Sequence, residues 1–311
     1  MATEPTIAVL SAATVARQSR AVNWHSTIRD YWALTKPEVN FLILITTFAG
    51  FDLASTAGLS GFRIAPLMHT LLGTMLVAGG TGTVNQFLER SFDAQMRRTA
   101  RRPLASERLT PSHVLWFGIS LSMAGTVYLA VAVNALTSLL AIVTLLSYLF
   151  LYTPLKRKTP LCTLVGAFPG AVPPLIGWAA ARGRLDPEAW ALYAIVFLWQ
   201  FPHFMAIAWM YREDYVRAGY LVLPATGARE RFVIWQTCLG SLALIPVSWM
   251  AGIGSKLGPA WSVGTLLLGL IFLWYSARFA LRRSNVSARQ LLTASIVYLP
   301  LIFGLLILNK K

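Results

Sequence analysis

The sequence predicts an all-α protein that crosses a membrane several times. The chain has 311 residues, of which 56% are hydrophobic and only 13% are charged, and its mean hydropathy is +0.59. So few charged residues cannot solvate the surface of a globular protein of this size. Apolar stretches long enough to span the hydrocarbon core recur along the chain, and most basic residues lie in alternate loops between them.

A hydrocarbon core about 30 Å thick requires about 20 apolar residues per helix, and about nine stretches approach this length. The expected spans are residues 39–56, 66–88, 113–133, 136–152, 161–181, 189–210, 232–252, 260–281 and 291–308. The longest loops, which follow the second and sixth spans, have only about 20 residues and cannot hold a soluble domain. Residues 31–311 are therefore expected to form a single transmembrane domain.

The distribution of basic residues predicts the orientation. Nine spans place the termini on opposite sides, and all but six of the 27 Lys and Arg residues lie on the N-terminal side; the six are Arg63, Arg182, Arg184, Lys256, Lys310 and Lys311. Because cytoplasmic loops are enriched in Lys and Arg, the N-terminus is expected in the cytosol. The net charge of +15 then reflects membrane lipid as a partner and gives no reason to expect nucleic acid.

The N-terminal segment, residues 1–30, is expected to be a disordered cytosolic tail. It is rich in Ala, Ser and Thr, carries Arg17 and Arg20, and lacks the long apolar core of a signal peptide. We expect the cell inner (plasma) membrane as the location. A mitochondrial transit segment, and with it the mitochondrial inner membrane, is the alternative.

The end of the second span carries a pattern typical of a metal-bound diphosphate site. Asn85, Glu89 and Asp93 stand at i, i+4 and i+8, so in a helix they cover only about 80° of one face. Such hard oxygen ligands suit Mg²⁺, which is usually held by one or two carboxylates together with substrate phosphates. The next residues include guanidinium groups that match phosphate oxygens, namely Arg97, Arg98, Arg101 and Arg102.

Two other loops on the same side offer complementary groups. Arg212, Glu213 and Asp214 follow the sixth span, and Asp214 could share a metal-bound diphosphate with Glu89 and Asp93. The loop after the fourth span would close the site with Lys156, Arg157 and Lys158. For the basic residues the alternative is a role in orientation or in lipid contact, whereas Asp and Glu contribute little to topology.

Two features inside the spans leave alternatives open. His203 follows Pro202 in an aromatic span, where it either supports a helix bend or contacts a ligand; it could cover the face of a porphyrin or bind its iron. Residues 166–178 place three prolines and several glycines inside the fifth span. Such a broken helix either lines a cavity or allows a close helix crossing.

Seven segments occur in this order along the chain: LTKPEV (34–39), NQFLERSFDAQMRRTARRPL (85–104), YTPLKRKTP (152–160), GAVPPLIGWAA (170–180), WQFPHFMAIAW (199–209), DYVRAGYLVLP (214–224) and SIVYLPLIF (295–303). Together they resemble the UbiA-type intramembrane prenyltransferases, and most closely the branch that acts on haem. The resemblance covers nearly the whole chain after the tail.

The resemblance implies a bundle of nine transmembrane helices around a central cavity. It also implies that farnesyl diphosphate and haem B are converted to haem O and diphosphate, a step toward the haem of terminal oxidases, with possible handover to the next haem-modifying enzyme. The metal and catalytic roles of the family fall on Asn85, Glu89, Asp93 and, by position, Asp214. Glu89 stands where the family commonly has Asp. Glu38 stands where a basic residue is common, which leaves Lys36 as the nearby cation.

Two other functions remain as alternatives at this stage. A related prenyltransferase that acts on a quinone precursor would use the same diphosphate site with a different acceptor pocket. A porphyrin transporter would use the proline-broken span as part of a substrate path, although the sequence shows no convincing inverted repeat.

Overall fold

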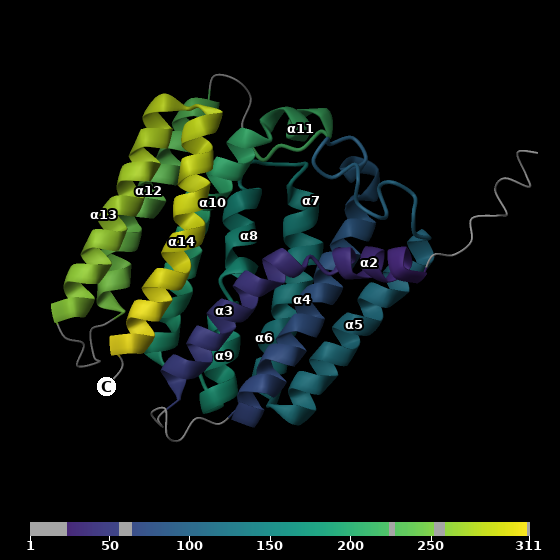
Figure 1. Ribbon diagram of the computed structural model, residues 1–311, viewed down its shortest axis with the longest axis horizontal. Coiled ribbons are helices and arrows are strands. Elements are labelled where there is room, and N and C mark those ends of the chain that lie inside the picture. Colours follow the sequence, from purple (N-terminus) through teal and green to yellow (C-terminus); the bar gives the residue numbers. More distant parts are fainter. Residues whose placement is uncertain (1–23, 56–63, 224–227, 252–258, 310–311) are drawn as a thin grey trace, which may run out of the picture.

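The fold is a bundle of long helices (Figure 1). The computed structural model describes residues 24–55, 64–223, 228–251 and 259–309, and within these ranges the chain contains no strand. In the same ranges, nine helical stretches are long and apolar enough to cross a membrane. The prediction of an all-α, multi-pass membrane protein is confirmed.

The bounds of the helical elements follow in chain order. They are α2 (Trp24–Leu34), α3 (Pro37–Ala54), α4 (Ile64–Asp93), α5 (Pro111–Ala132), α6 (Ala135–Leu146), the π-helical turn η2 (Ser147–Tyr152), α7 (Thr153–Leu155), α8 (Cys162–Gly170), α9 (Pro173–Arg182), α10 (Pro187–Met210), α11 (Arg212–Arg217), α12 (Arg229–Met250), α13 (Pro259–Arg282) and α14 (Asn285–Asn309).

Each expected span corresponds to one of these helices or to a composite of them. The fourth span combines α6, η2 and α7, and the fifth combines α8 and α9. In the second span, the observed helix differs most from the expected one at its end: α4 continues past the expected residue 88 to Asp93. Glu89 and Asp93 are therefore helical. The expected ends at residues 56 and 252 lie outside the described part of the chain.

Helix α2 was not predicted. It overlaps the last residues of the expected tail, 1–30, while residues 1–23 lie outside the described ranges. The helix runs across the neighbouring spans (Figure 1), and its Tyr31 ring packs edge-on against Phe117 of α5 at 4.9 Å between centroids. Leu34, at its end, is fully buried. This contact fixes the corner from which α3 begins.

Several spans begin with proline in the first turn, where the missing N–H has no intrahelical partner to lose. Pro37, Pro111 and Pro187 occupy this position in α3, α5 and α10. Helix α6 begins differently: the Asn134 side chain accepts a hydrogen bond from the backbone N–H of Thr137 at 2.8 Å. These local signals set where the spans start.

The break between α8 and α9 is part of a close helix crossing. A Cβ atom on Gly177 of α9 would collide with the carbonyl oxygen of Thr47 in α3, and one on Gly50 of α3 would collide with the carbonyl oxygen of Pro174. On the other side, the Gln200 amide of α10 donates to the Ala167 carbonyl at 3.2 Å. The structure thus favours the packing interpretation of the proline- and glycine-rich segment, because neighbouring helices satisfy and enclose it.

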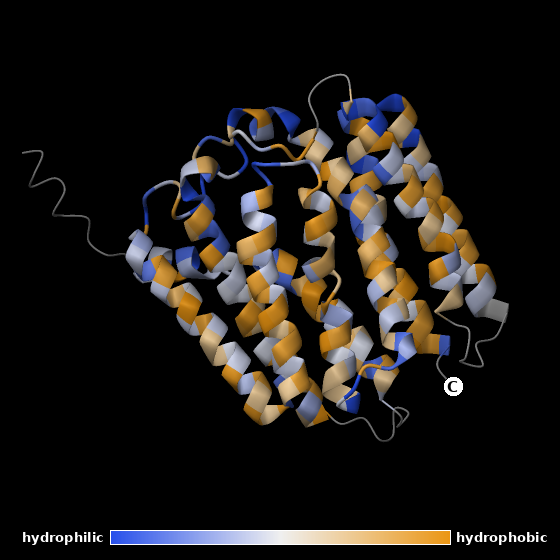
Figure 2. Cartoon of the chain, turned by 180° about the vertical axis from the view of Figure 1, so that it is seen from behind, coloured by the Kyte–Doolittle hydropathy of each residue, from blue (hydrophilic) through white to orange (hydrophobic). Residues whose placement is uncertain are grey.

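Polar residues gather at one end of the bundle (Figure 2). This end carries residues 94–110, the loop after α7, and α11, and is called the basic end below. The sides of the spans present many apolar side chains, among them Trp116, Phe150 and Leu266, which are 66%, 67% and 48% exposed. Such surfaces suit contact with lipid tails.

Replacing Gly177 with Ala should destabilise the protein, because the added methyl group forces α3 and α9 apart. We expect a loss of about 1–3 kcal/mol, seen as a lower Tm of the detergent-solubilised protein. Gly304→Ala in α14 is the control: nothing lies within 4 Å of its Cβ position, so its Tm should be unchanged or higher. Equal Tm values for the wild type and Gly177→Ala would contradict the close crossing.

Candidate functional site

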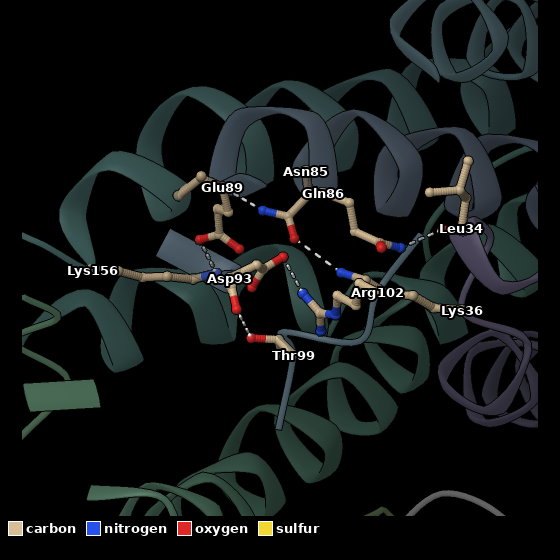
Figure 3. Close-up of polar contacts among 10 residues, drawn as sticks. Leu34, Lys36, Asn85, Gln86, Glu89, Asp93, Thr99, Arg102 and Lys156 are labelled. Atoms are coloured by element: carbon tan, nitrogen blue, oxygen red, sulfur yellow. Dashed lines mark hydrogen bonds and ion pairs between the residues drawn. The ribbon is translucent and has the colours of Figure 1, made fainter. Parts of the chain in front are cut away.

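The predicted row of oxygen-bearing side chains lies at the basic end of α4 and faces inward. Asn85, Glu89 and Asp93 are only 1%, 6% and 2% exposed. They occupy the last turns of one continuous helix, so their shared face follows from the helical repeat (Figure 3). Buried carboxylates are costly unless charged partners compensate them.

Each of the three side chains has a basic partner from a different segment. Lys156 Nζ donates to Glu89 Oε1 at 2.8 Å, and Arg102 Nη1 donates to Asp93 Oδ2 at 2.6 Å. Lys36 Nζ donates to Asn85 Oδ1 at 2.9 Å. Figure 3 shows these three cations converging on α4 from separate parts of the chain. The three pairs form one buried polar cluster.

The corner between α2 and α3 holds Lys36 in place. Its backbone is left-handed, with φ of 52°, which is uncommon for a residue with a side chain. The Gln86 amide of α4 donates to the Leu34 carbonyl at 2.9 Å and so ties this corner to the carboxylate row. Burial, assisted by the nearby Arg102 charge, lowers the pKa of Lys36 to about 7.

Lys156 directly follows α7, which continues the π-helical turn η2, and π-helical turns are often found at functional sites. Its ammonium group lies 4.5 Å from the ring centroid of Tyr152 and 5.9 Å from that of Tyr148. Burial alone would lower the pKa of Lys156, but the Glu89 carboxylate and the two tyrosines raise it well above its ordinary value. Lys156 therefore stays charged beside Glu89.

Arg102 is placed by a compact loop that folds back over the end of α4. The Thr99 hydroxyl donates to the Asp93 carbonyl at 2.8 Å, which turns the chain directly after the helix. Asp214 of α11 holds the same loop from the other side: its Oδ2 accepts from the Arg98 backbone N–H at 3.2 Å, and its Oδ1 accepts from Arg217 at 3.1 Å. Asp214 thus joins the two loops that the sequence singled out.

The remaining predicted residues lie at the rim or elsewhere. Arg97, Arg98 and Arg101 are exposed, as are Arg157 and Lys158. A cavity of about 410 Å³ opens at this rim, lined by Arg97, Arg98, Met210, Tyr211, Glu213 and Asp214.

Two predicted residues bond to other parts of the chain instead. Arg212 donates to the Trp209 carbonyl and to Asn285, at 2.8 and 2.9 Å. His203 bonds to Ser295 of α14 at 2.8 Å. In the described part of the chain, neither residue bonds to the cluster on α4.

Several members of the site were not predicted from the sequence. Thr153 accepts a hydrogen bond from the Asn85 amide at 3.2 Å, and Tyr148 and Tyr152 flank Lys156. The buried Tyr220 hydroxyl lies near Glu89 but outside hydrogen-bond geometry, and burial raises its pKa above the usual range. The i, i+4 spacing of Tyr148 and Tyr152 beside a charged loop was the available signal.

The donor set fits a magnesium ion that is shared with a substrate. The described residues contain no group of three His, Cys, Asp or Glu side chains close enough to form a protein-only metal site. Mg²⁺ rarely uses such a cage; it typically takes one or two carboxylates and completes its shell with water and phosphate oxygens. Glu89 and Asp93 supply two buried carboxylates on one face, with the Asn85 amide oxygen beside them.

The fold is a membrane-embedded helical bundle, and its site pairs carboxylates with cations at one end. These features define a class of intramembrane protein suited to hold an anionic, metal-binding headgroup beside an apolar interior. Within that class, the sequence model of the UbiA prenyltransferase family matches residues 43–307. The chain belongs to this family.

Curated relatives resemble the chain over most of its length. It is 49% identical over 289 residues to "Protoheme IX farnesyltransferase" of Solibacter usitatus, covering 91% of this chain and 99% of that protein. It is 42% identical to the protein of the same name from Koribacter versatilis, covering 92% and 94%. The predicted family resemblance is confirmed.

Solved structures share the fold at low identity. A structure of digeranylgeranylglyceryl phosphate synthase superposes with a TM-score of 0.74 at 15% identity, covering 91% of this chain and 98% of that one. A UbiA homologue from Archaeoglobus fulgidus bound to GPP and Mg²⁺ gives a TM-score of 0.65 at 16% identity, covering 89% and 99%.

Removing one member of the Glu89–Lys156 pair should be strongly destabilising. Lys156→Met leaves a buried carboxylate without its cation, and we expect a loss of about 3–5 kcal/mol in the free energy of unfolding in detergent. The double variant Glu89→Gln/Lys156→Met should recover most of this loss, because the uncompensated charge is gone. Additive effects of the two substitutions would contradict a direct pair.

Proposed function

We propose that this protein transfers the farnesyl group of farnesyl diphosphate to a vinyl group of haem B, with addition of water, to give haem O and diphosphate. The observation that carries this proposal is the buried row of Asn85, Glu89 and Asp93, each with its own basic partner. The close sequence similarity to proteins named protoheme IX farnesyltransferase supports the choice of donor and acceptor.

Asn85, Glu89 and Asp93 are the residues that would hold Mg²⁺, with Asp214 as the fourth ligand suggested by position. A bound ion would offset negative charge on the diphosphate as it leaves. The homologue from A. fulgidus bound to GPP and Mg²⁺ supports this assignment by its fold. Asp214 requires more rearrangement than the others, because both of its oxygens hold the Arg98–Arg217 side of the loop.

The paired cations suggest how the site accepts a charged headgroup. If Glu89, Asp93 and the Asn85 amide oxygen turn to a metal ion, their partners Lys156, Arg102 and Lys36 become free to bind phosphate oxygens. Other basic residues near the ends of the spans can attract and guide the anion. They are the exposed Arg97, Arg98, Arg101, Arg157 and Lys158, together with Arg212. Preorganised positive charge lowers the barrier to breaking the allylic C–O bond.

The reaction balances as follows. The allylic C–O bond of farnesyl diphosphate breaks and diphosphate leaves with the electron pair. The terminal vinyl carbon of haem B bonds to C1 of the farnesyl group, and the positive charge moves to the vinyl carbon attached to the porphyrin. Water adds there and loses a proton, which gives a hydroxyethylfarnesyl side chain. The apolar interior of the bundle keeps bulk water from the allylic cation.

We also propose the cell inner membrane, with the N-terminus in the cytosol, as the location. The bias of Lys and Arg toward the basic end supports this orientation, because cytoplasmic loops are enriched in both. Haem O is an apolar product that stays in the membrane. Handover to the next haem-modifying enzyme would then occur within the bilayer.

Asp93→Asn should lower haem O formation in membranes by at least about 100-fold, because the substitution removes the charge that holds the ion while keeping the side-chain shape. The amount of inserted protein should not change. Asp30→Asn is the matched control: Asp30 also pairs with an arginine, Arg108, but lies outside the cluster. Wild-type turnover in the Asp93 variant would remove this residue from the metal site.

The acceptor can be identified by product mass. Membranes that contain the protein, supplied with farnesyl diphosphate and Mg²⁺, should convert haem B to haem O and should leave 4-hydroxybenzoate unchanged. Chelation by EDTA should stop the reaction, and added Mg²⁺ should restore it. A farnesylated 4-hydroxybenzoate would instead identify a prenyltransferase that acts on quinone precursors.

A further inference from the structure

Away from the cluster on α4, helices α10 and α14 hold a histidine in a defined orientation. His203 of α10 lies in the interior of a span and is only partly exposed. Its ring stacks on Trp199, with centroids 4.6 Å apart and planes 24° apart. Its Nδ1 atom lies 2.8 Å from the hydroxyl oxygen of Ser295, which is fully buried in α14.

The hydrogen bonds of Ser295 determine which nitrogen of His203 carries the proton. A serine hydroxyl has one hydrogen to donate, and Ser295 Oγ lies 2.6 Å from the Leu292 carbonyl oxygen, which can only accept. The serine hydrogen is therefore used there, and Ser295 Oγ accepts at its contact with His203. The proton is therefore assigned to Nδ1, and Nε2 keeps its lone pair.

The same serine also fixes the ring on which His203 stacks. Trp199 Nε1 donates to the Ser295 backbone carbonyl at 2.8 Å. In the described part of the chain, Nε2 of His203 makes no hydrogen bond. One residue of α14 thus orients the imidazole and leaves its second nitrogen available as a ligand. Metal-binding histidines are usually held in this way, by a hydrogen bond to the other ring nitrogen.

His203 and Asn85 lie at similar distances from the ends of their helices. His203 lies seven residues before Met210, the end of α10, or about 10 Å along the helix. Asn85 lies eight residues before Asp93 at the end of α4, about 12 Å. The imidazole is therefore set back from the basic end by a distance similar to that of the innermost member of the cluster.

We propose that His203 Nε2 is an axial ligand to the iron of the haem acceptor, and that Ser295 is a positioning residue that fixes the required tautomer. This inference rests on the proposed function for the identity of the acceptor. Neutral imidazole is a common axial ligand of haem iron. Ligation at one point would limit how the macrocycle moves and so help to present a vinyl group to the allylic carbon.

The test is a titration of the full-length protein, purified in detergent, with ferric haem B, followed by absorption spectroscopy. The wild type should give the spectrum of imidazole-ligated iron. His203→Ala should lose it, added imidazole should restore it, and His203→Phe should also lack it while keeping the aromatic stack. His69→Ala is the matched control: His69 bonds through Nδ1 to the Tyr128 hydroxyl at 2.6 Å, and its replacement should leave the spectrum unchanged.

Ser295 provides a second, independent arm. Ser295→Ala should raise the Kd for haem B about 10-fold or more, since loss of a partner that orients a ligand typically costs this much. Ser295→Thr keeps the hydroxyl and should stay close to the wild type. The backbone carbonyl that binds Trp199 remains in both variants, so this arm holds even if replacement of His203 prevents folding.

Iron-free protoporphyrin IX separates ligation from packing. It should bind the wild type and both Ser295 variants with the same Kd. Four results would overturn the proposal. The first two are a wild type without imidazole-ligated iron and a folded His203 variant with the wild-type haem spectrum. The other two concern Ser295→Ala: a Kd for haem B equal to that of the wild type, or a Kd for iron-free porphyrin that rises as much as the Kd for haem B. The farnesyl-transfer assay is interpreted separately. If His203 binds the iron but no farnesyl group is transferred, only the proposed function is refuted. If transfer occurs but His203 does not bind the iron, only its role as an iron ligand is refuted.

Discussion

The organisation of the basic end depends on one constraint: a carboxylate cannot be buried at the end of a membrane span without a cation beside it. Glu89 and Asp93 are almost fully buried, and their partners Lys156 and Arg102 come from two different loops. Asp214 then ties the Arg102 loop to α11. The need to compensate two charges thus determines how three loops meet above the spans.

The same pairs suggest why the site suits an anionic headgroup with a metal ion. The protein already places two carboxylates and three cations at the position where a metal ion and an anion would bind. The ligand would therefore exchange partners with charges that are already there. The aromatic rings of Tyr148 and Tyr152 enclose Lys156 and limit its contact with water. An electrostatic interaction in such a place is stronger than at a solvated surface.

The spans and the carboxylate row could be predicted because each depends on local sequence. Apolar length gives the spans, and the i, i+4, i+8 spacing places Asn85, Glu89 and Asp93 on one face. Their partners could not be predicted individually, because the contacts of Lys36, Arg102 and Lys156 depend on how separate loops fold over α4. The same is true of Asp214: its sequence position suggested a ligand, but its carboxylate holds the Arg98 backbone. Helix α2 was missed because its amphipathic pattern is short and lies beside a tail of low complexity.

The central claim, that the row on α4 binds a diphosphate through a divalent ion, is tested most directly by equilibrium binding of a non-reactive farnesyl diphosphate analogue. Calorimetry on the purified full-length chain should show binding with Mg²⁺. With EDTA the affinity should fall at least about 10-fold, which corresponds to about 1.4 kcal/mol of binding free energy. Glu89→Gln should bind weakly under both conditions. Equal affinity with and without the metal, and in the variant, would contradict the account.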